Sequence, residues 1–551
     1  MDRPLTRFAL ALLAILAIVV AFDNLQRPLA NPDEGRYSEI SREMKASGDW
    51  ITPRLNGIKY FEKPPLQYWS SALALKLFGE SEITARLYVA LCGLLTLAIV
   101  GYTGARLATS EAGVLSAIAL LSSPYFVALG GIVTLDMGLT LWTTVALCAF
   151  LIAEGAAEDA DARRSWMLVA WAGAAFAVLS KGLVGAVFPA AAFVLYWMVS
   201  RDRKALRRLH WKPGLAVFLA ITAPWFVAVS LANPEFARFF FVHEHFERFL
   251  TTTHHRVAPP WYFLPIVFVG FLPWMFALPA AALHALRSER PSGAFLASFR
   301  PLTFALIWAV FVVGFFSLSS SKLPGYILPA FPALALVLGR YLADALPGRL
   351  AAWVWPIVPV SLGLAWLVWQ APLRARDEWT RSMYEHAQVW AYLGVGVLFL
   401  SSAIATVLLW RGRRWLGIVT LALGTMILID CIEDAYEAFS HRASGLVVAE
   451  HMRPLLTPET RVYSVKHYDQ TVPFYIGRTV TLVNYTDEFA LGLAAEPGKS
   501  ITDLQAFARD WVRPGPALAI IQPGIHEQLK AQGLPMQLVL EDPRRVLVRK
   551  P

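Results

Sequence analysis

A group of charged residues follows the first long apolar run of the chain. The segment 31–65 comes directly after the nearly uncharged run 8–22. Its carboxylates could orient a substrate or move a proton, and its cations could bind a phosphate. Charges beside a membrane are unfavourable unless they pair or serve a substrate, so this segment is the first candidate for a functional site. The side chains concerned are Asp33, Glu34, Arg36, Glu62 and Lys63.

Further polar residues stand at the ends of later apolar runs. Asp136 lies in GGIVTLDMG, and Lys322 and Tyr326 lie in SSSKLPGY. Lys181, in LSKGLVG, is typical of a lysine whose stem stays in the apolar layer while its charge reaches the boundary. Simpler roles remain open, because acidic residues such as Asp33, Glu34 or Asp136 also suit the first turn of a helix.

The segment 232–260 carries histidines and an arginine. Arg248 follows the tripeptide His243-Glu244-His245. These residues have metal-ligand atoms, but positions i and i+2 point apart on a helix. A divalent metal held by Glu62 and His243 is an alternative to a site without a metal. No cofactor is required, because lysine and arginine can serve a phosphate themselves.

Composition favours a membrane protein. Of the 551 residues, 56% are hydrophobic and only 16% are charged. The apolar residues fall in about thirteen runs of roughly 17–25 residues, the length that a helix needs to cross the hydrocarbon layer. Only helices and closed barrels satisfy their backbone groups there, so the sequence predicts a polytopic α-helical bundle. The first run has no obvious cleavage site after it, which favours a retained helix over a signal peptide.

The basic residues predict the orientation of the bundle. Alternate connections carry clusters of arginine and lysine, and such connections face the cytoplasm. The segments 31–81, 232–260 and 371–389 then face outward, as does the C-terminal tail. The net charge of +9 reflects this topology and contact with lipid, not nucleic acid. The basic connections contain Arg3, Arg7, Arg163, Arg164, the run 201–212, Arg287, Arg290, Arg411, Arg413 and Arg414.

The last part of the chain, 434–551, has a different pattern. Short β-branched and aliphatic runs predict strands at 461–465, 479–483, 517–521, 537–540 and 546–548. Segments 444–456 and 502–512 fit helices between them. This alternation predicts a small α/β domain after a membrane domain of residues 1–433. It contains no glycine-rich phosphate loop, so no chemistry is assigned to it.

Two segments of the first outward loop, residues 26–81, have helical periodicity. Tyr37, Ile40 and Met44 recur on one face, and Leu66, Leu73 and Leu77 do so after Pro64-Pro65. Both segments fit amphipathic helices that lie on the membrane surface. The cysteines Cys92, Cys148 and Cys431 lie in or beside apolar runs and are expected to be packing residues.

Together these features predict a receptor for an amphiphile with a phosphate. Outward segments that are distant in sequence would bring Lys63, Arg248 and Lys322, with Arg36, to one face beside carboxylates. Such cations bind phosphate, and an apolar cavity between helices would take a lipid tail. A carrier lipid with a phosphate-linked head group fits both parts.

The ordered motifs resemble the GT-C-type glycosyltransferases related to the protein O-mannosyltransferases. Within that superfamily, residues 8 to about 340 are similar to the bacterial aminoarabinose transferases of lipid A. The motifs are the Asp33-Glu34 pair, YFEKPPLQYW, LSKGLVGAVFP, HEHFERF, HHRVAPPWYFLP and SKLPGYILP.

This resemblance implies transfer of 4-amino-4-deoxy-L-arabinose from undecaprenyl phosphate to lipid A phosphate groups, and with it resistance to polymyxin. It implies Asp33 as the catalytic acid, Lys63 and Arg248 on the donor phosphate, and Asp136 as a second acid. The implied substrate-binding residues are Glu34, Arg36, Tyr60, Glu62, Lys63, Asp136, Arg248, Lys322 and Tyr326.

The resemblance also implies a monomer in the bacterial inner membrane, with the site and the C-terminal domain in the periplasm. Two alternatives stay open. One is a polyprenyl-phosphate-dependent glycosyltransferase with another sugar or a protein acceptor. The other, from a different class, is a lipid transporter or flippase, which would favour internal repeats and helices broken at mid-membrane.

Overall fold

The computed structural model describes residues 15–23, 25–156, 159–201, 205–242, 258–289 and 299–551. The chain forms two compact units. The helical unit comprises Met1–Leu25, Arg86–Val227 and Phe240–Ala438, and the α/β unit comprises Gln26–Ala85, Ala228–Phe239 and Phe439–Pro551. The first outward loop therefore groups with the C-terminal segment.

Eight helices of the described residues are long and apolar enough to cross a membrane. The bent pair α5 (Ser110–Leu121) and α6 (Pro124–Gly130), with 69° between its halves, would make a ninth span. The predicted bundle is confirmed, and the count of about thirteen stays a prediction. The eight are α4 (Glu82–Leu107), α7 (Leu135–Gly155), α11 (Trp211–Ala232), α16 (Pro301–Leu318), η3 with α17 (Pro324–Ala330 and Phe331–Asp344), α18 with α19 (Pro347–Val354 and Ile357–Gln370), α20 (Glu378–Trp410) and α21 (Arg414–Ala443).

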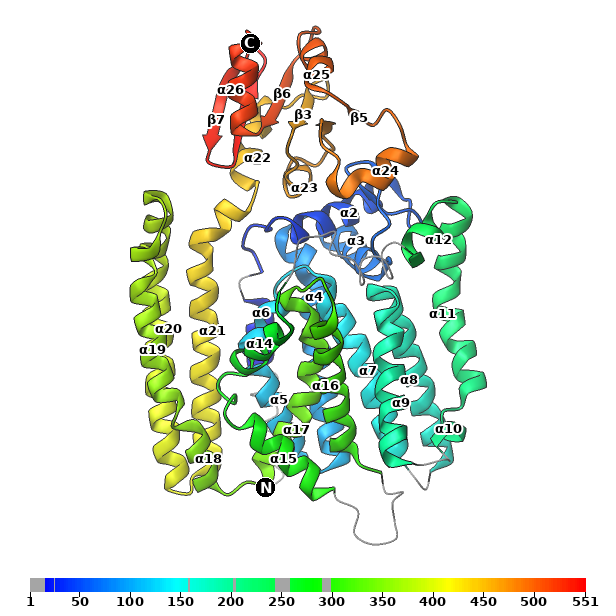
Figure 1. Ribbon diagram of the computed structural model, residues 1–551, viewed down its shortest axis with the longest axis vertical. Helices are drawn as coiled ribbons and strands as arrows, with labels where there is room; N and C mark the ends of the chain where they lie inside the picture. The colour runs from blue at the N-terminus through cyan, green and yellow to red at the C-terminus, as the bar shows by residue number, and fades with distance from the viewer. Residues whose placement is uncertain (1–14, 24, 157–158, 202–204, 243–257, 290–298) are drawn as a thin grey trace. The chain divides into compact units, whose positions relative to one another are not determined.

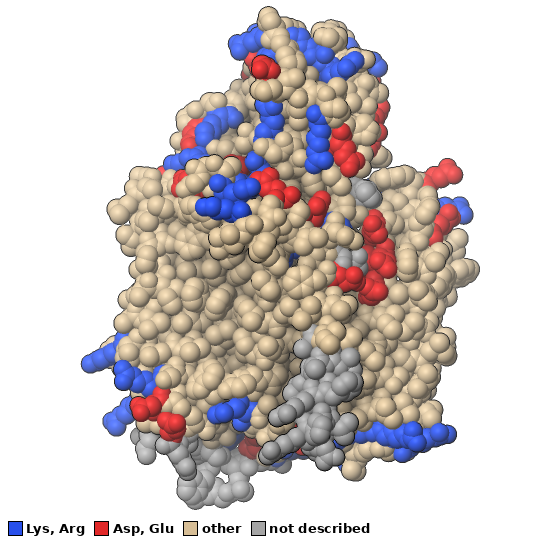
Figure 2. Space-filling view, turned by 180° about the vertical axis from the view of Figure 1, so that it is seen from behind, with Lys and Arg blue, Asp and Glu red and all other residues tan. Residues whose placement is uncertain are grey.

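Small residues and aromatic rings pack the helical unit. A Cβ atom added at Gly394 of α20 would lie 2.9 Å from Cys431 of α21, so the two backbones approach closely. α19, α20 and α21 run side by side (Figure 1). In the core, the rings of Phe150 and Phe304 stack at 5.0 Å between centroids. Figure 2 shows that the flank of this unit carries few charges along its middle, as a lipid-facing surface requires.

The C-terminal part of the α/β unit contains a six-stranded sheet in the order β5-β4-β3-β6-β8-β7. The four strands from β5 to β6 are parallel, and β8 runs antiparallel to both β6 and β7. This arrangement confirms the predicted α/β domain. The strands are β3 (Arg461–Val465), β4 (Thr481–Val483), β5 (Ser500–Ile501), β6 (Ala517–Ile521), β7 (Gln537–Asp542) and β8 (Arg545–Arg549).

Helices accompany the strands of this sheet. Trp511 and Phe507, both from α25, are buried against the central strands. The predicted helices 444–456 and 502–512 are confirmed as α22 with η5 and as α25. The helices are α22 (Leu446–Met452), η5 (Arg453–Leu455), α23 (Val472–Ile476), η6 (Asp487–Phe489), α24 (Ala490–Ala495), α25 (Leu504–Trp511) and α26 (Pro523–Ala531).

The first outward segment forms α2 (Asp33–Ser47), a hairpin of β1 (Arg54–Leu55) with β2 (Ile58–Lys59), and α3 (Leu66–Phe78). Both helices were predicted, and their place on the membrane surface stays a prediction, but the polar face of α2 is not exposed to water as an amphipathic surface helix would have it. Its polar residues Glu39 and Arg42 are buried along with its apolar ones. A Cβ atom at Gly35 would lie 2.6 Å from the backbone of Gln470, so the C-terminal segment covers the polar face of α2.

A pair of glutamates is enclosed by this packing. Glu39 accepts two 2.7 Å hydrogen bonds from the guanidinium of Arg42, and Glu43 accepts a 2.7 Å bond from the backbone N–H of Gly57. Burial, and then the negative charge of Glu39, raise the pKa of Glu43 well above its usual value. The folded protein therefore binds a proton at Glu43 more tightly than the unfolded chain does, and its stability falls as the pH rises above about 4.3.

We predict that Glu43→Gln makes this stability less dependent on pH. A neutral amide keeps the shape and the Gly57 contact without a charge that must be buried. The melting temperature of the purified variant should fall less than that of the wild type between about pH 5 and pH 8. The exposed Glu459→Gln is the matched control. Parallel curves for the wild type and Glu43→Gln would contradict this account.

Candidate functional site

An aspartate and a lysine meet at one end of the helical unit. Asp136 is the second residue of α7, and Lys181 is the last residue of α8 (Ala160–Lys181), so the antiparallel helices bring both to the same end. Lys181 Nζ forms an ion pair with Asp136 Oδ1, and both side chains are largely buried. In such a pair, each side chain is the partner that makes burial of the other less unfavourable.

The SKLPGY segment lies against this pair. Lys181 Nζ stands 4.6 Å from the centre of the Tyr326 ring, a cation–π contact. A Cβ atom at Gly325 would lie 2.6 Å from Asp136 Oδ2, so a larger residue here would push the Asp136 carboxylate aside. Lys322, which is buried, donates a 2.5 Å hydrogen bond to the carbonyl of Ser319. The structure thus places Asp136 and Tyr326 beside Lys181, a lysine whose charge the sequence predicts to reach the membrane boundary. Lys322 lies in the same segment as Tyr326, and its role toward a substrate stays a prediction.

A second group of charges lies in the α/β unit. Asp33, the first residue of α2, accepts a 2.8 Å hydrogen bond from Arg36 Nη1 one turn later. Arg36 Nε donates a 2.5 Å hydrogen bond to Glu488, which follows β4 in the C-terminal domain. Gln470 donates a 2.8 Å hydrogen bond to the other oxygen of Glu488. One guanidinium therefore joins two carboxylates that are far apart in sequence.

The two carboxylates differ in how far they are exposed to solvent. The side chain of Asp33 is 39% exposed, whereas those of Arg36 and Glu488 are 13% and 7% exposed. Burial opposes the charge of Arg36, but the neighbouring Tyr60 and Glu488 outweigh burial and raise its pKa. Burial also raises the pKa of Glu488, against the attraction of Arg36. Asp33 is the member of the group that a substrate can reach.

Residues 60–63 adjoin this group. Burial, followed by the negative charge of Glu62, raises the pKa of Tyr60, which also interacts with Arg36. The Tyr60 hydroxyl is buried without a hydrogen-bond partner among the described residues. Lys63 Nζ donates a 2.8 Å hydrogen bond to the carbonyl of Glu62. Asp33, Arg36, Tyr60 and Glu62 therefore form one neighbourhood, and their roles toward a substrate stay a prediction.

Other expected site residues are placed differently or lie outside the described part. Glu34 is buried and accepts a 2.9 Å hydrogen bond from the backbone N–H of Ala30, which supports the start of α2. Arg248 and His243 lie outside the described residues, so the convergence of Lys63, Arg248 and Lys322 stays a prediction. Within the described ranges, no group of three metal-ligating side chains occurs. Metal binding by Glu62 and His243 stays a prediction too.

Sequence reasoning missed two partners of the acidic residues. Glu488 lies in TDEFALGL, which has no motif, and only the folded chain brings it to Arg36. For Lys181, the sequence predicts only that its charge reaches the boundary of the apolar layer, and not that it pairs with Asp136. A signal for it was available, because Asp136 and Lys181 end adjacent apolar runs on the same side.

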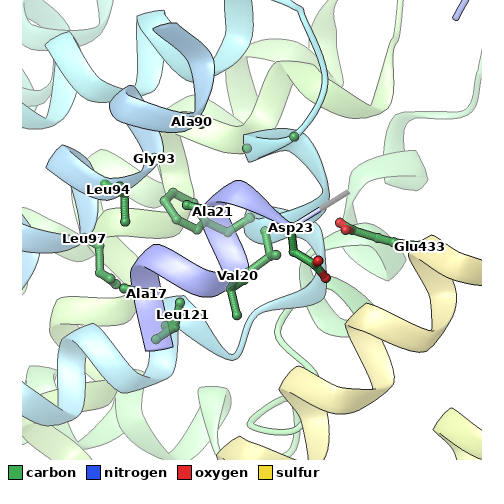
Figure 3. A pocket seen from close by; sticks show the side chains of 14 residues that line it. Ala17, Val20, Ala21, Asp23, Ala90, Gly93, Leu94, Leu97, Leu121 and Glu433 are labelled. Carbon is green, nitrogen blue, oxygen red and sulfur yellow. The ribbon is translucent and has the colours of Figure 1, made fainter. Parts of the chain in front are cut away.

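A further acidic pair, outside both groups, does not form a candidate site. Asp23 and Glu433 face each other at the rim of a small apolar pocket (Figure 3). The pocket has a volume of only 30 Å³, about the space of one water molecule. Glu433 also lines a larger apolar cavity of 450 Å³ between α6, α14 (Phe263–Gly270) and α21. Tyr125, on the wall of this larger cavity, donates a hydrogen bond to the carbonyl of Pro324 in the SKLPGY segment.

Two sequence families match this chain. Residues 5–240 match the dolichyl-phosphate-mannose-protein mannosyltransferase family, and residues 448–550 match the aminoarabinose transferase C-terminal domain. The fold is similar to that of the archaeal oligosaccharyltransferase AglB from Archaeoglobus fulgidus, with a TM-score of 0.52 and 14% identity over 93% of this chain and 69% of that one. The fold and the acid–cation pairs define a membrane glycosyltransferase of GT-C type.

Nearer relatives identify the family. The crystal structure of ArnT from Cupriavidus metallidurans bound to undecaprenyl phosphate has 37% identity and a TM-score of 0.92, over 98% of this chain and 97% of that one. The chain belongs to the family of undecaprenyl phosphate-α-4-amino-4-deoxy-L-arabinose arabinosyl transferases. The relative from Pseudomonas fluorescens is 30% identical over 84% of this chain and 78% of its own length. The relative from Edwardsiella ictaluri is 35% identical over 61% of this chain, and the aligned part spans 59% of that relative.

We predict that Gly325→Ala lowers the rate of glycosyl transfer. The added methyl group would displace the Asp136 carboxylate from Lys181, and a misplacement of about 1 Å can reduce a rate about 100-fold. The initial rate of the purified enzyme is the measurement. Gly363→Ala, at a position on α19 with open space around it, is the control. Equal rates for Gly325→Ala and the control would show that the position of Asp136 does not matter.

Proposed function

We propose that this chain transfers 4-amino-4-deoxy-L-arabinose from undecaprenyl phosphate to phosphate groups of lipid A at the periplasmic face of the inner membrane. The observation that carries this proposal is the near-complete match to a relative whose structure contains undecaprenyl phosphate. The paired acids and cations of both units support it. The proposal includes resistance to polymyxin, because the transferred sugar adds a positive charge to lipid A.

The cations serve the donor phosphate. In the reaction, an oxygen of the acceptor phosphate attacks the anomeric carbon, and the bond from this carbon to the donor phosphate oxygen breaks. The electron pair leaves with undecaprenyl phosphate, which gains negative charge. Preorganised lysine and arginine side chains stabilise this charge in a site with little water. Lys63, Arg248 and Lys322 are assigned to this role.

Asp33 acts on the sugar. A phosphate acceptor is already anionic near neutral pH and requires no general base. The exposed carboxylate of Asp33 instead orients the sugar, pairs with its ammonium group and stabilises positive charge at the anomeric carbon. Arg36 holds one oxygen of this carboxylate, so the other remains for the substrate. The second acid, Asp136, is held by Lys181 within the helical unit, and we assign it a role in the same reaction.

The apolar cavity supports lipid substrates. It is lined by Pro124, Ile266, Val269 and Ile429, and by Tyr125 beside the SKLPGY segment. A hydrocarbon chain buried there would gain about 0.8 kcal/mol for each methylene group removed from water. The acid–cation pair near this segment and the apolar cavity thus suit the two parts of an amphiphilic substrate.

Basic residues support the proposed orientation. Asp136 and Lys181 mark one end of α7 and α8, and the opposite end of α7 carries Glu154, which pairs with Arg208. Of the described basic residues, Arg163 and Arg164 in the first turns of α8 and Arg208 lie toward that opposite end, as residues of cytoplasmic loops do. Asp136 and its neighbours are then periplasmic. A single copy of the chain is proposed as the active species.

Lys63→Ala and Asp33→Asn should each nearly abolish transfer while leaving the protein folded in detergent. In Lys63→Ala, loss of one preorganised donor raises the barrier by about 2.7–4 kcal/mol, or about 100- to 1,000-fold in rate. In Asp33→Asn, the negative charge that stabilises the anomeric carbon is lost. Transfer of the sugar from the polyprenyl donor to lipid A is followed with purified enzyme. Lys76→Ala, at an exposed position on α3, is the matched control. Full activity of either variant would remove that residue from the mechanism.

The proposed acceptor can be tested in cells. Deletion of the gene should remove aminoarabinose from lipid A, as measured by mass spectrometry, and should increase sensitivity to polymyxin. Complementation with the wild-type chain should restore both properties, and complementation with Lys63→Ala should not. Unchanged lipid A in the deletion strain would reject the acceptor, although a polyprenyl donor could still be demonstrated with the purified enzyme.

A further inference from the structure

The C-terminal domain makes several contacts with the first outward segment. Most of them fix the β1–β2 hairpin or α2 and do not involve Asp33. Arg54 of the hairpin forms a 2.9 Å ion pair with Glu496, and Asn56 exchanges hydrogen bonds with the backbone of Val480. Arg42 donates a 3.0 Å hydrogen bond to the carbonyl of Gly477. These bonds fix the hairpin and α2 to the domain without involving Asp33.

Glu488 is different because its partner also holds Asp33. Arg36 Nε donates to Glu488 at 2.5 Å, and Arg36 Nη1 donates to Asp33 at 2.8 Å. Glu488 is itself oriented by the 2.8 Å hydrogen bond from Gln470. With the side chains of Arg36 and Glu488 largely buried, the arrangement fixes the rotamer of a long, flexible side chain next to the partly exposed carboxylate of Asp33.

The division of the guanidinium between two carboxylates has a chemical consequence. Arginine prefers to bind one carboxylate through two parallel N–H groups. Without Glu488, the side chain could turn and take both oxygens of Asp33, or move toward an anionic substrate. With Glu488 present, the recorded bond from Arg36 to Asp33 uses Oδ1 alone. Asp33 then keeps its orientation and an oxygen for the sugar.

We propose that Glu488 is a positioning residue for the transfer reaction: it holds Arg36 so that Arg36 orients Asp33. The C-terminal domain thereby contributes a residue to the organisation of the active site and is more than a covering module. This inference rests on the proposed function, because Asp33 must act on the substrate for its orientation to affect the rate.

The test compares Glu488→Gln with the wild type. Glutamine keeps the size of the side chain and removes its charge, so Arg36 should lose its fixed position. Removal of a group that orients a reacting residue typically lowers activity about 10- to 100-fold. We expect this loss in kcat, with the KM for the donor little changed, because Glu488 does not touch the substrate. Glu488→Asp, which retains the charge, should recover part of the rate.

Glu496→Gln is the matched control. It removes an ion pair between the same domain and the same outward segment, but its partner Arg54 does not bond to Asp33. It should keep kcat near the wild-type value, even where it lowers the melting temperature as much as Glu488→Gln does. Equal losses of kcat in the two variants would show a general effect of docking and would overturn the proposal.

A double-mutant cycle identifies the route of the effect. If Glu488 acts through Arg36, Glu488→Gln should lower kcat no further in an Arg36→Gln background. Independent, additive losses would overturn the proposal, as would a fully active Glu488→Gln enzyme. The wild type in the same assay separates the two levels of inference. An inactive wild type rejects the proposed function together with this role, whereas an active wild type beside a fully active Glu488→Gln rejects only the role of Glu488.

Discussion

The described part of this enzyme depends on the pairing of carboxylates with largely buried cations. Asp136 is held by Lys181 in the helical unit, and Asp33 is held by Arg36 in the α/β unit. An isolated buried charge is strongly unfavourable, and removal of one partner leaves the other uncompensated. The pairs therefore supply each carboxylate with a cationic partner, and they fix where each carboxylate points.

Much of the fold could be predicted because it follows from local patterns. Apolar runs of membrane length predicted the helical bundle, and short aliphatic runs predicted β3 and β6 with the observed bounds. The position of α2 could not be predicted in this way. Its periodicity is that of a surface helix, but the C-terminal segment covers its polar face, as the close approach of Gly35 to Gln470 shows. An amphipathic pattern indicates that the two faces of a helix differ in polarity. It does not indicate which part of the protein covers the polar face.

In the candidate site too, contacts between residues that are close in sequence are easier to predict than contacts between distant ones. Asp33, Arg36, Tyr60 and Glu62 lie close together in the chain, and their neighbourhood was predicted. Glu488 was not, since it stands more than four hundred residues from Arg36 in a segment without a motif. Long-range ion pairs of this kind depend on the tertiary fold, and a single sequence has no periodicity that would reveal them. The roles of these residues rest on their geometry and on the family to which the chain belongs.

The pairing also bears on the chemistry of the acceptor. A transferase that acts on a hydroxyl group benefits from a carboxylate that is free to take a proton. Here Arg36 already occupies an oxygen of Asp33, and Lys181 occupies one of Asp136. A site that must admit two phosphate groups has a different requirement, because unpaired acids would repel both substrates. Acids that are each held by a cation remove this repulsion and still leave an oxygen to orient the sugar. Within each unit the recorded contact of the acid with its cation is compatible with the anionic acceptor that we propose.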